Sequence, residues 1–129
     1  MTEAPGTVGV TFAKGVLDDV AELTTVADSD KAGEDEAEAL KRRIAELLVE
    51  CKGNPFIGEL MGPGLHPELV NCRRVRFDIP THKAKPRFRL IYRNEPIDGA
   101  PAECHWLTVA PRSGLQAHRR ARQRSKRRG

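Results

Sequence analysis

Arginines alternate with apolar residues in two neighbouring stretches of the chain, residues 72–79 and 87–93, where Arg74 and Arg76 fall on one face of the first stretch and Arg87, Arg89 and Arg93 on one face of the second. Because side chains on a strand point alternately to opposite faces, each stretch predicts a strand with one apolar face and one arginine-rich face. Guanidinium groups bind phosphate through paired hydrogen bonds, so these arginines predict binding to RNA or DNA: Arg74, Arg76, Arg87, Arg89 and Arg93. The alternative is that half-buried strands simply turn arginine towards solvent, with no ligand involved.

The remaining reactive side chains form no motif for another chemistry. Three widely spaced cysteines lack a Cys-x-x-Cys pair, and the histidines have no finger-like spacing, so we expect neither a metal nor a cofactor. No glycine-rich nucleotide-binding motif is present. The N-terminus lacks the features of a signal peptide, which predicts reduced thiols and a cytoplasmic protein. No stretch approaches the ~18 apolar residues of a membrane span, so we expect no membrane partner.

Charge is divided unevenly along the chain. Residues 1–50 hold 5 Lys/Arg and 12 Asp/Glu, whereas residues 51–129 hold 17 Lys/Arg and 6 Asp/Glu. The net charge of +4 therefore combines an acidic half of −7 with a basic half of +11. This asymmetry predicts that the C-terminal half faces a polyanion while the acidic half stays in solvent.

Hydrophobic periodicity outlines the elements that would position the arginines. A first strand is predicted over residues 8–12, and apolar residues then recur at helical spacing up to Leu23. A second helix is predicted over residues 34–51, with a stripe formed by Leu40, Ile44, Leu47, Leu48 and Cys51. Residues 28–35 read as a turn and residues 52–69 as a loop. A third C-terminal strand is predicted over residues 103–109, and a last helix over residues 113–124.

These elements predict an α+β fold. Consecutive strands joined by short turns pair antiparallel, so we expect a small antiparallel sheet with the two N-terminal helices packed on one face and a basic C-terminal helix. A chain of 129 residues suits a single domain. We expect this domain to cover residues 1–124 and residues 125–129 to form a disordered basic tail.

The element order and the arginines resemble the RelE/ParE superfamily of type II toxin–antitoxin toxins. The resemblance covers roughly residues 8–124, and its motifs lie in residues 69–120: L-x-x-C-R-R-V-R, F-R-L-I-Y, V-A-P-R and a following helix with His118. No single motif is specific, and it is their order and spacing that carry the resemblance. The sequence between the last two strands is longer than the hairpin of compact members.

For the RelE branch, the resemblance implies a metal-independent messenger RNA endoribonuclease. The ribose 2′-hydroxyl attacks the adjacent phosphate, which leaves a 2′,3′-cyclic phosphate and a free 5′-hydroxyl. Arg89 and Arg112 match the arginines that stabilise the phosphate, and His118 stands where members carry a tyrosine or histidine that protonates the leaving oxygen. Histidine suits this role at neutral pH. Arg74 and Arg76 match a basic pair on the preceding strand.

Two roles remain open from the residues themselves. His118 also reads as a surface residue of a basic helix. Arginine cannot accept a proton at neutral pH, so Arg74 and Arg76 cannot serve as the general base. Glu68 is a candidate base, but it also reads as an ordinary loop carboxylate.

Three functions therefore follow from the sequence. The first is an endoribonuclease toxin with a cognate antitoxin, messenger RNA and, if it is ribosome-dependent, the ribosome as partners. The second is a ParE-like toxin that inhibits DNA gyrase by binding without nuclease activity. The third is a non-toxic RNA-binding module of the same fold.

Overall fold

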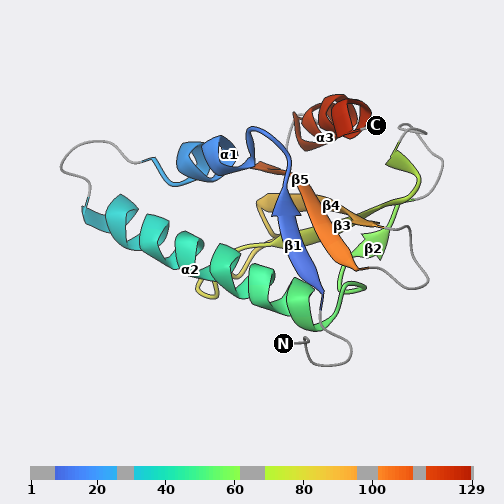
Figure 1. Ribbon diagram of the computed structural model, residues 1–129. Coiled ribbons are helices and arrows are strands. Elements are labelled where there is room, and N and C mark those ends of the chain that lie inside the picture. Colours follow the sequence, from blue (N-terminus) through green and yellow to red (C-terminus); the bar gives the residue numbers. More distant parts are fainter. Residues whose placement is uncertain (1–7, 26–30, 62–68, 96–101, 112–115, 129) are drawn as a thin grey trace.

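The computed structural model describes residues 8–25, 31–61, 69–95, 102–111 and 116–128. These residues form five strands and three helices (Figure 1). In chain order the elements are β1 (Gly9–Phe12), α1 (Val16–Leu23), α2 (Lys31–Gly53), β2 (Glu59–Leu60), β3 (Cys72–Phe77), β4 (Phe88–Glu95), β5 (Glu103–Pro111) and α3 (Gln116–Arg128).

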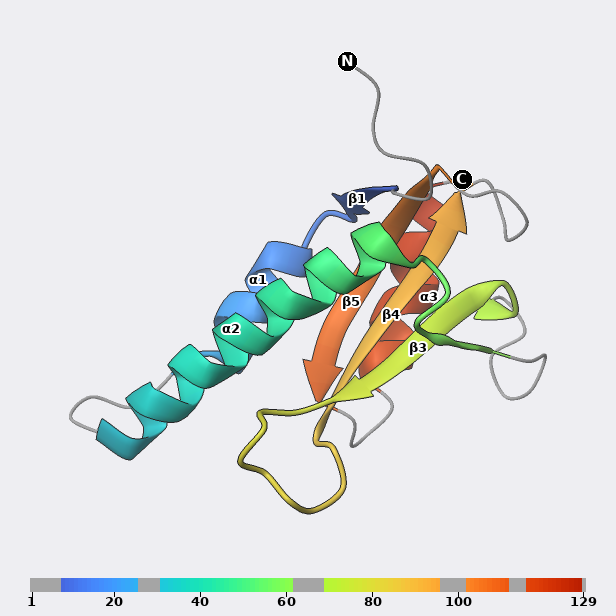
Figure 2. The ribbon, with the colours of Figure 1, turned by 90° about the horizontal axis from the view of Figure 1, so that it is seen from below.

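The five strands make one sheet in the order β1-β5-β4-β3-β2. The three C-terminal strands pair antiparallel, as the sequence predicts. β1 is added at the edge beside β5 and runs parallel to it, so the complete sheet is mixed. Helices α2 and α3 lie on opposite faces of the sheet (Figures 1 and 2).

The larger core lies between α2 and the sheet. The predicted stripe of α2 packs there through Leu40, Ile44, Leu47 and Cys51. The apolar faces of β3 and β4 meet it, with Phe77 and Leu90 buried and Val75 and Phe88 partly buried against them. The predicted alternation of the two arginine-bearing strands and their packing against this helix are confirmed.

A smaller core lies under α3. It contains Cys72 of β3, Ile91 of β4, Leu107 of β5 and the alanines Ala117 and Ala121 of α3. Four arginines lie on the same face of the sheet: Arg74 and Arg76 of β3, and Arg89 and Arg93 of β4. The face was expected to be open, and the structure shows that α3 covers part of it.

A register shift in the pairing of β4 and β5 determines which side chains of β5 point to each face of the sheet. Ile91 pairs with Thr108 whereas its neighbour Tyr92 pairs with Trp106, so Leu107 is an extra residue. In a regular strand, Trp106 and Val109 would point to opposite faces. The irregularity lets both enter the core on the α2 side while Leu107 enters the other core.

Several predicted boundaries move. The first helix begins at Val16 and not near Phe12, which belongs to β1, because Gly15 at its N-cap has φ of 100° and interrupts the helical pattern. α2 already begins at Lys31, inside the predicted turn, and the predicted loop contains the two-residue strand β2. α3 continues to Arg128, through residues that were expected to form a tail.

The part of the chain that the structure describes contains no helix both long and apolar enough to cross a membrane.

Candidate phosphate-binding site under helix α3

Arg89 and His118 meet between the sheet and α3. Nη1 of Arg89 lies 3.1 Å from Nδ1 of His118 and 3.5 Å from its Nε2, although the two residues are 29 positions apart. Arg89 is only 7% exposed and His118 only 5%. The structure therefore brings together two of the three predicted catalytic residues, and it corrects the expectation that Arg89 lies on an open surface. The reason is that α3 packs over this part of β4.

The contact determines the protonation of His118 in this conformation. A guanidinium group can only donate hydrogen bonds, so the imidazole nitrogen facing it must accept. The shorter distance to Nδ1 fits a neutral ring that carries its proton on Nε2. A neutral imidazole is not an effective acid at neutral pH, so His118 could not protonate a leaving group while this contact is closed.

The arginines of β3 continue the basic surface beside this pair. Arg76 pairs with Arg89 in the register of β3 and β4, so their side chains lie on the same face. Arg76 is exposed and, among the described residues, makes no ion pair. Arg74 is less accessible, because its Nη2 atom lies 2.9 Å from a carboxylate oxygen of Glu59.

Arg87 belongs to a different cluster from the other predicted phosphate ligands. Its guanidinium donates to Asp78 at 2.9 Å and to Glu36 of α2 at 2.7 Å. These hydrogen bonds, with that to Asp78 the stronger cause, raise the pKa of Arg87. Because it binds both Asp78 and Glu36, Arg87 ties α2 to the sheet. A phosphate could bind Arg87 only by displacing these two carboxylates.

The same cluster controls the ionisation of Asp78. Burial would raise the pKa of this carboxyl group, but hydrogen bonds from the Arg87 side chain and from the backbone N–H groups of Arg87 and Ile79 lower it to about 2. The side chain of Asp78 is 5% exposed. Asp78 therefore stays ionised down to strongly acidic pH.

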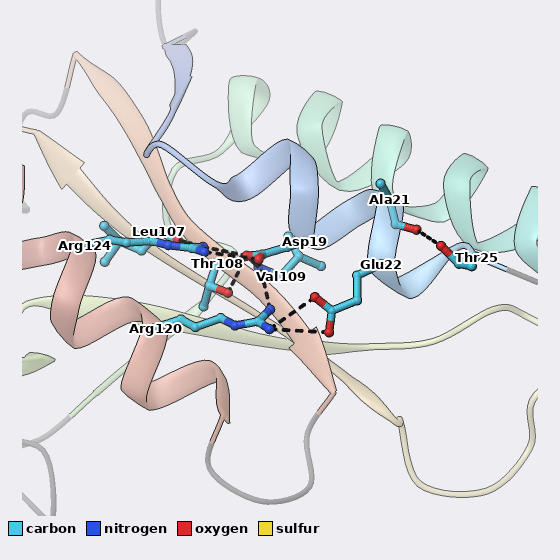
Figure 3. A network of polar contacts seen from close by, with 9 residues as sticks. All are labelled: Asp19, Ala21, Glu22, Thr25, Leu107, Thr108, Val109, Arg120 and Arg124. Carbon is cyan, nitrogen blue, oxygen red and sulfur yellow. Dashed lines mark hydrogen bonds and ion pairs between the residues drawn. The ribbon is translucent and has the colours of Figure 1, made fainter.

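Asp19 of α1 was missed by sequence reasoning, which singled out the apolar positions of this helix and assigned Asp19 no role. It is 3% exposed, and Figure 3 shows it between β5 and α3. Its carboxylate accepts from the Thr108 hydroxyl at 2.7 Å, from Arg120 at 2.9 Å and from Arg124 at 2.6 Å. The spacing of the two arginines, four apart on one side of a helix, is the sequence signal that could have indicated a shared acidic partner.

Two predicted site residues cannot be placed. Arg112, the second predicted phosphate stabiliser, and Glu68, the candidate base, both lie outside the described residues.

All three thiols lie in the interior of the protein. Cys51, Cys72 and Cys104 are free and buried, and burial raises the pKa of Cys72 to about 11. Cys72 is therefore a packing residue rather than a nucleophile. Within the described residues, no three His, Cys, Asp or Glu side chains come close enough together to hold a metal ion.

Comparison of the whole structure with solved structures finds a significant match. The E. coli toxin RelE, solved in the free state as a mutant with two arginines replaced by alanine, superposes with a TM-score of 0.56 and 15% identity. The match covers 92% of this chain and 97% of that chain. The chain has a RelE-like fold.

At the level of sequence, no protein-family model matches the chain, and no curated protein matches it significantly. The RelE-like fold therefore rests on structure, over nearly the full length of both chains. In this fold β4 and α3 position the Arg89–His118 pair.

Proposed function

We propose that this chain is the toxin of a type II toxin–antitoxin system and cleaves messenger RNA without a metal ion. The observation that carries the proposal is the contact between Arg89 and His118 inside a RelE-like fold. It joins a group that binds phosphate to a group that can carry a proton, on two elements far apart in the sequence.

The geometry supports different roles for the two side chains, phosphate binding for Arg89 and proton transfer for His118. A phosphate that reaches Arg89 competes for the guanidinium donors that now bind His118. The released Nδ1 atom can then take a proton from water, and the imidazolium beside the phosphate can donate that proton to the leaving 5′-oxygen. Arg89 stabilises the negative charge that develops on the phosphorane. We assign Arg112 the same task.

The surroundings of the pair support RNA as the ligand. Arg76 extends the positive surface along β3, and α3 carries a run of arginines. Neither feature supplies a general base, because guanidinium groups do not accept protons at neutral pH. The attacking 2′-hydroxyl would therefore lose its proton to a group outside the described residues or to water.

The proposal also implies a partner and a location. A toxin of this kind needs a cognate antitoxin, and the excess of positive charge in residues 51–129 suits an acidic or amphipathic segment. It would act in the cytoplasm, on free messages or on messages in the ribosome. Co-expression with the product of an adjacent small gene should yield a stable complex and relieve growth arrest.

The test is inducible expression in a bacterium followed by mapping of the 5′ ends of its messages. We expect new ends that carry a 5′-hydroxyl, and their loss in the Arg89→Ala variant. Growth arrest with intact messages and inhibited gyrase would favour the ParE-like function. If the cells show no growth arrest and no cleaved messages, the result would favour a non-toxic RNA-binding module.

A further inference from the structure

Helix α3 presents little apolar surface to the sheet. Among its described side chains, the buried apolar ones are Ala117 and Ala121. Two methyl groups offer no shape that interlocks with the strands below, so they hold the helix near the sheet without fixing its rotation. Polar contacts on the two flanks of the helix must determine which way its side chains point.

Those flank contacts fall on opposite sides of the alanines. At about 100° per residue, Arg120 and Arg124 lie on one flank of α3, and His118 and Ser125 lie on the other. The second flank meets β4, where His118 contacts Arg89 and the Ser125 hydroxyl accepts from Arg93 at 2.6 Å. The first flank meets the buried carboxylate of Asp19.

Asp19 is itself fixed from the other direction. Its carboxylate accepts from the Thr108 hydroxyl at 2.7 Å and from the backbone N–H of Val109 at 3.3 Å. Arg124 in turn donates to the backbone carbonyl of Leu107 at 2.9 Å. The carboxylate thus joins three elements, α1, β5 and α3, and cannot follow α3 if the helix turns (Figure 3).

The space around the contact is also closed. Gly15, which precedes α1, has a left-handed backbone, and a Cβ atom there would lie 2.7 Å from Nη2 of Arg124. The absence of a side chain at Gly15 therefore lets the Arg124 guanidinium reach Asp19.

From this arrangement we infer that Asp19 is a positioning residue. It fixes the rotation of α3 from one flank, and in doing so it holds His118 beside Arg89 on the other. The consequence for cleavage rests on the proposed function, whereas the consequence for the conformation of His118 does not.

The test compares two variants of α1 that remove the same charge. Asp19→Asn keeps the size of the buried side chain but loses the ion pairs with α3. Glu22→Gln is the matched control, because the Glu22 side chain is 57% exposed and, among the described residues, forms an ion pair only with Arg120, at 3.2 Å. Both variants raise the net charge by one unit, so a general electrostatic effect on RNA binding would be equal in the two.

Two readouts separate positioning from folding. We expect Asp19→Asn to lower the single-turnover cleavage rate by about tenfold or more, because a small displacement of a proton donor is costly. RNA affinity should change by less than about twofold, since no phosphate contact is removed. The imidazole ¹⁵N shifts of His118 should move from one fixed tautomer in the parent to an average of two. Glu22→Gln should match the parent in all three.

Arg120→Gln provides a second variant should Asp19→Asn fail to fold. It leaves Asp19 paired with Arg124, so the fold should persist with a smaller loss of rate and a partial change in the His118 spectrum. Unchanged His118 shifts in folded Asp19→Asn or Arg120→Gln would overturn the inference. A parent protein that cleaves no RNA would refute the proposed function alone, because the spectrum still decides whether Asp19 positions His118.

Discussion

Arg89 donates to the imidazole of His118 in this structure, so a phosphate that approaches Arg89 must replace a hydrogen bond that already exists. Such a pair favours a neutral histidine until an anion separates its members. In the proposed mechanism, His118 is therefore neutral beside the permanent positive charge of Arg89 and gains a second proton only after a substrate phosphate separates the pair.

This arrangement predicts large effects of single substitutions on the chemical step. Arg89→Ala should lower the cleavage rate by about a hundredfold or more, equivalent to about 3 kcal/mol of lost charge stabilisation. His118→Ala should lower it by about 10²–10⁴-fold and remove one limb of the pH profile. Single-turnover cleavage of a ribosome-bound message measures both.

The chain offers a control for each of these variants. Arg42, exposed on α2, and His82, in the connection between β3 and β4, lie outside the proposed site. Arg42→Ala and His82→Ala should cleave at the parental rate. Parental rates for Arg89→Ala and His118→Ala as well would remove both residues from the mechanism.

Tyr92, the tyrosine of the F-R-L-I-Y motif, has a structural role. Its hydroxyl donates to the carbonyl of Pro55 at 2.7 Å and accepts from the N–H of Gly58 at 3.0 Å. Burial raises the pKa of Tyr92, which makes it unsuited to proton transfer. Gly58 packs so closely that a Cβ atom would lie 2.9 Å from the ring of Tyr92.

We therefore expect Tyr92→Phe to destabilise the fold without slowing cleavage. The buried N–H of Gly58 would lose its acceptor, which costs about 1–3 kcal/mol. Urea unfolding followed by the fluorescence of Trp106, the single tryptophan, measures the loss. A strong loss of cleavage at unchanged stability would instead place Tyr92 in the site.

At the scale of elements, hydrophobic periodicity was sufficient to predict each helix or strand that buries an apolar face. The alternation in β3 and β4 and the stripe of α2 all point into one core, so pattern and packing agree. The packing of α3 on the sheet could not be predicted in this way, because α3 contacts its neighbours through alanines and arginines and has no apolar stripe. Asp19 was missed for the same reason, since an acidic residue on an amphipathic helix normally faces water.

The contact between α2 and the β3–β4 connection should make stability depend on acidic pH. Asp78 has a pKa of about 2 in the folded chain and an ordinary value of 3.8. Because the folded value is lower, the ionised group stabilises the fold above pH 3.8, and this contribution is lost as pH falls towards 2. The contribution is about 2 kcal/mol before screening, and solvent around the partly exposed Arg87 reduces it.

Thermal unfolding between pH 5 and pH 2 tests this contribution. In Asp78→Asn the dependence on pH over this range should become shallower, and stability at neutral pH should fall. Glu38→Gln is the control, because the Glu38 side chain is 69% exposed and, in the part of the chain that the structure describes, pairs only with Lys41 one turn along α2. An unchanged acid profile in Asp78→Asn would show that the cluster does not contribute to stability.

For the whole molecule, the fold places its most basic helix on one face of the sheet only. Helix α2, which carries 6 Asp/Glu and 5 Lys/Arg and is therefore nearly balanced in charge, covers one face of the sheet, and the arginine-rich α3 lies on the other (Figure 2). Exposed Arg76 belongs to the face that carries α3, whereas exposed Arg42 belongs to α2. The two arginines thus permit a test of which face RNA uses.

Removal of a phosphate contact lowers the salt dependence of binding as well as the affinity. Each contact with single-stranded RNA contributes about 0.7 to the slope of log K against log salt. Arg76→Ala should therefore reduce that slope by about 0.7 and weaken binding at low salt, and Arg42→Ala, with the same change in net charge, should leave both unchanged. Titration of a labelled RNA at several salt concentrations measures the slopes. Equal effects of the two variants would mean that RNA binding depends on total charge. This result would contradict the prediction that RNA binds the face that carries α3.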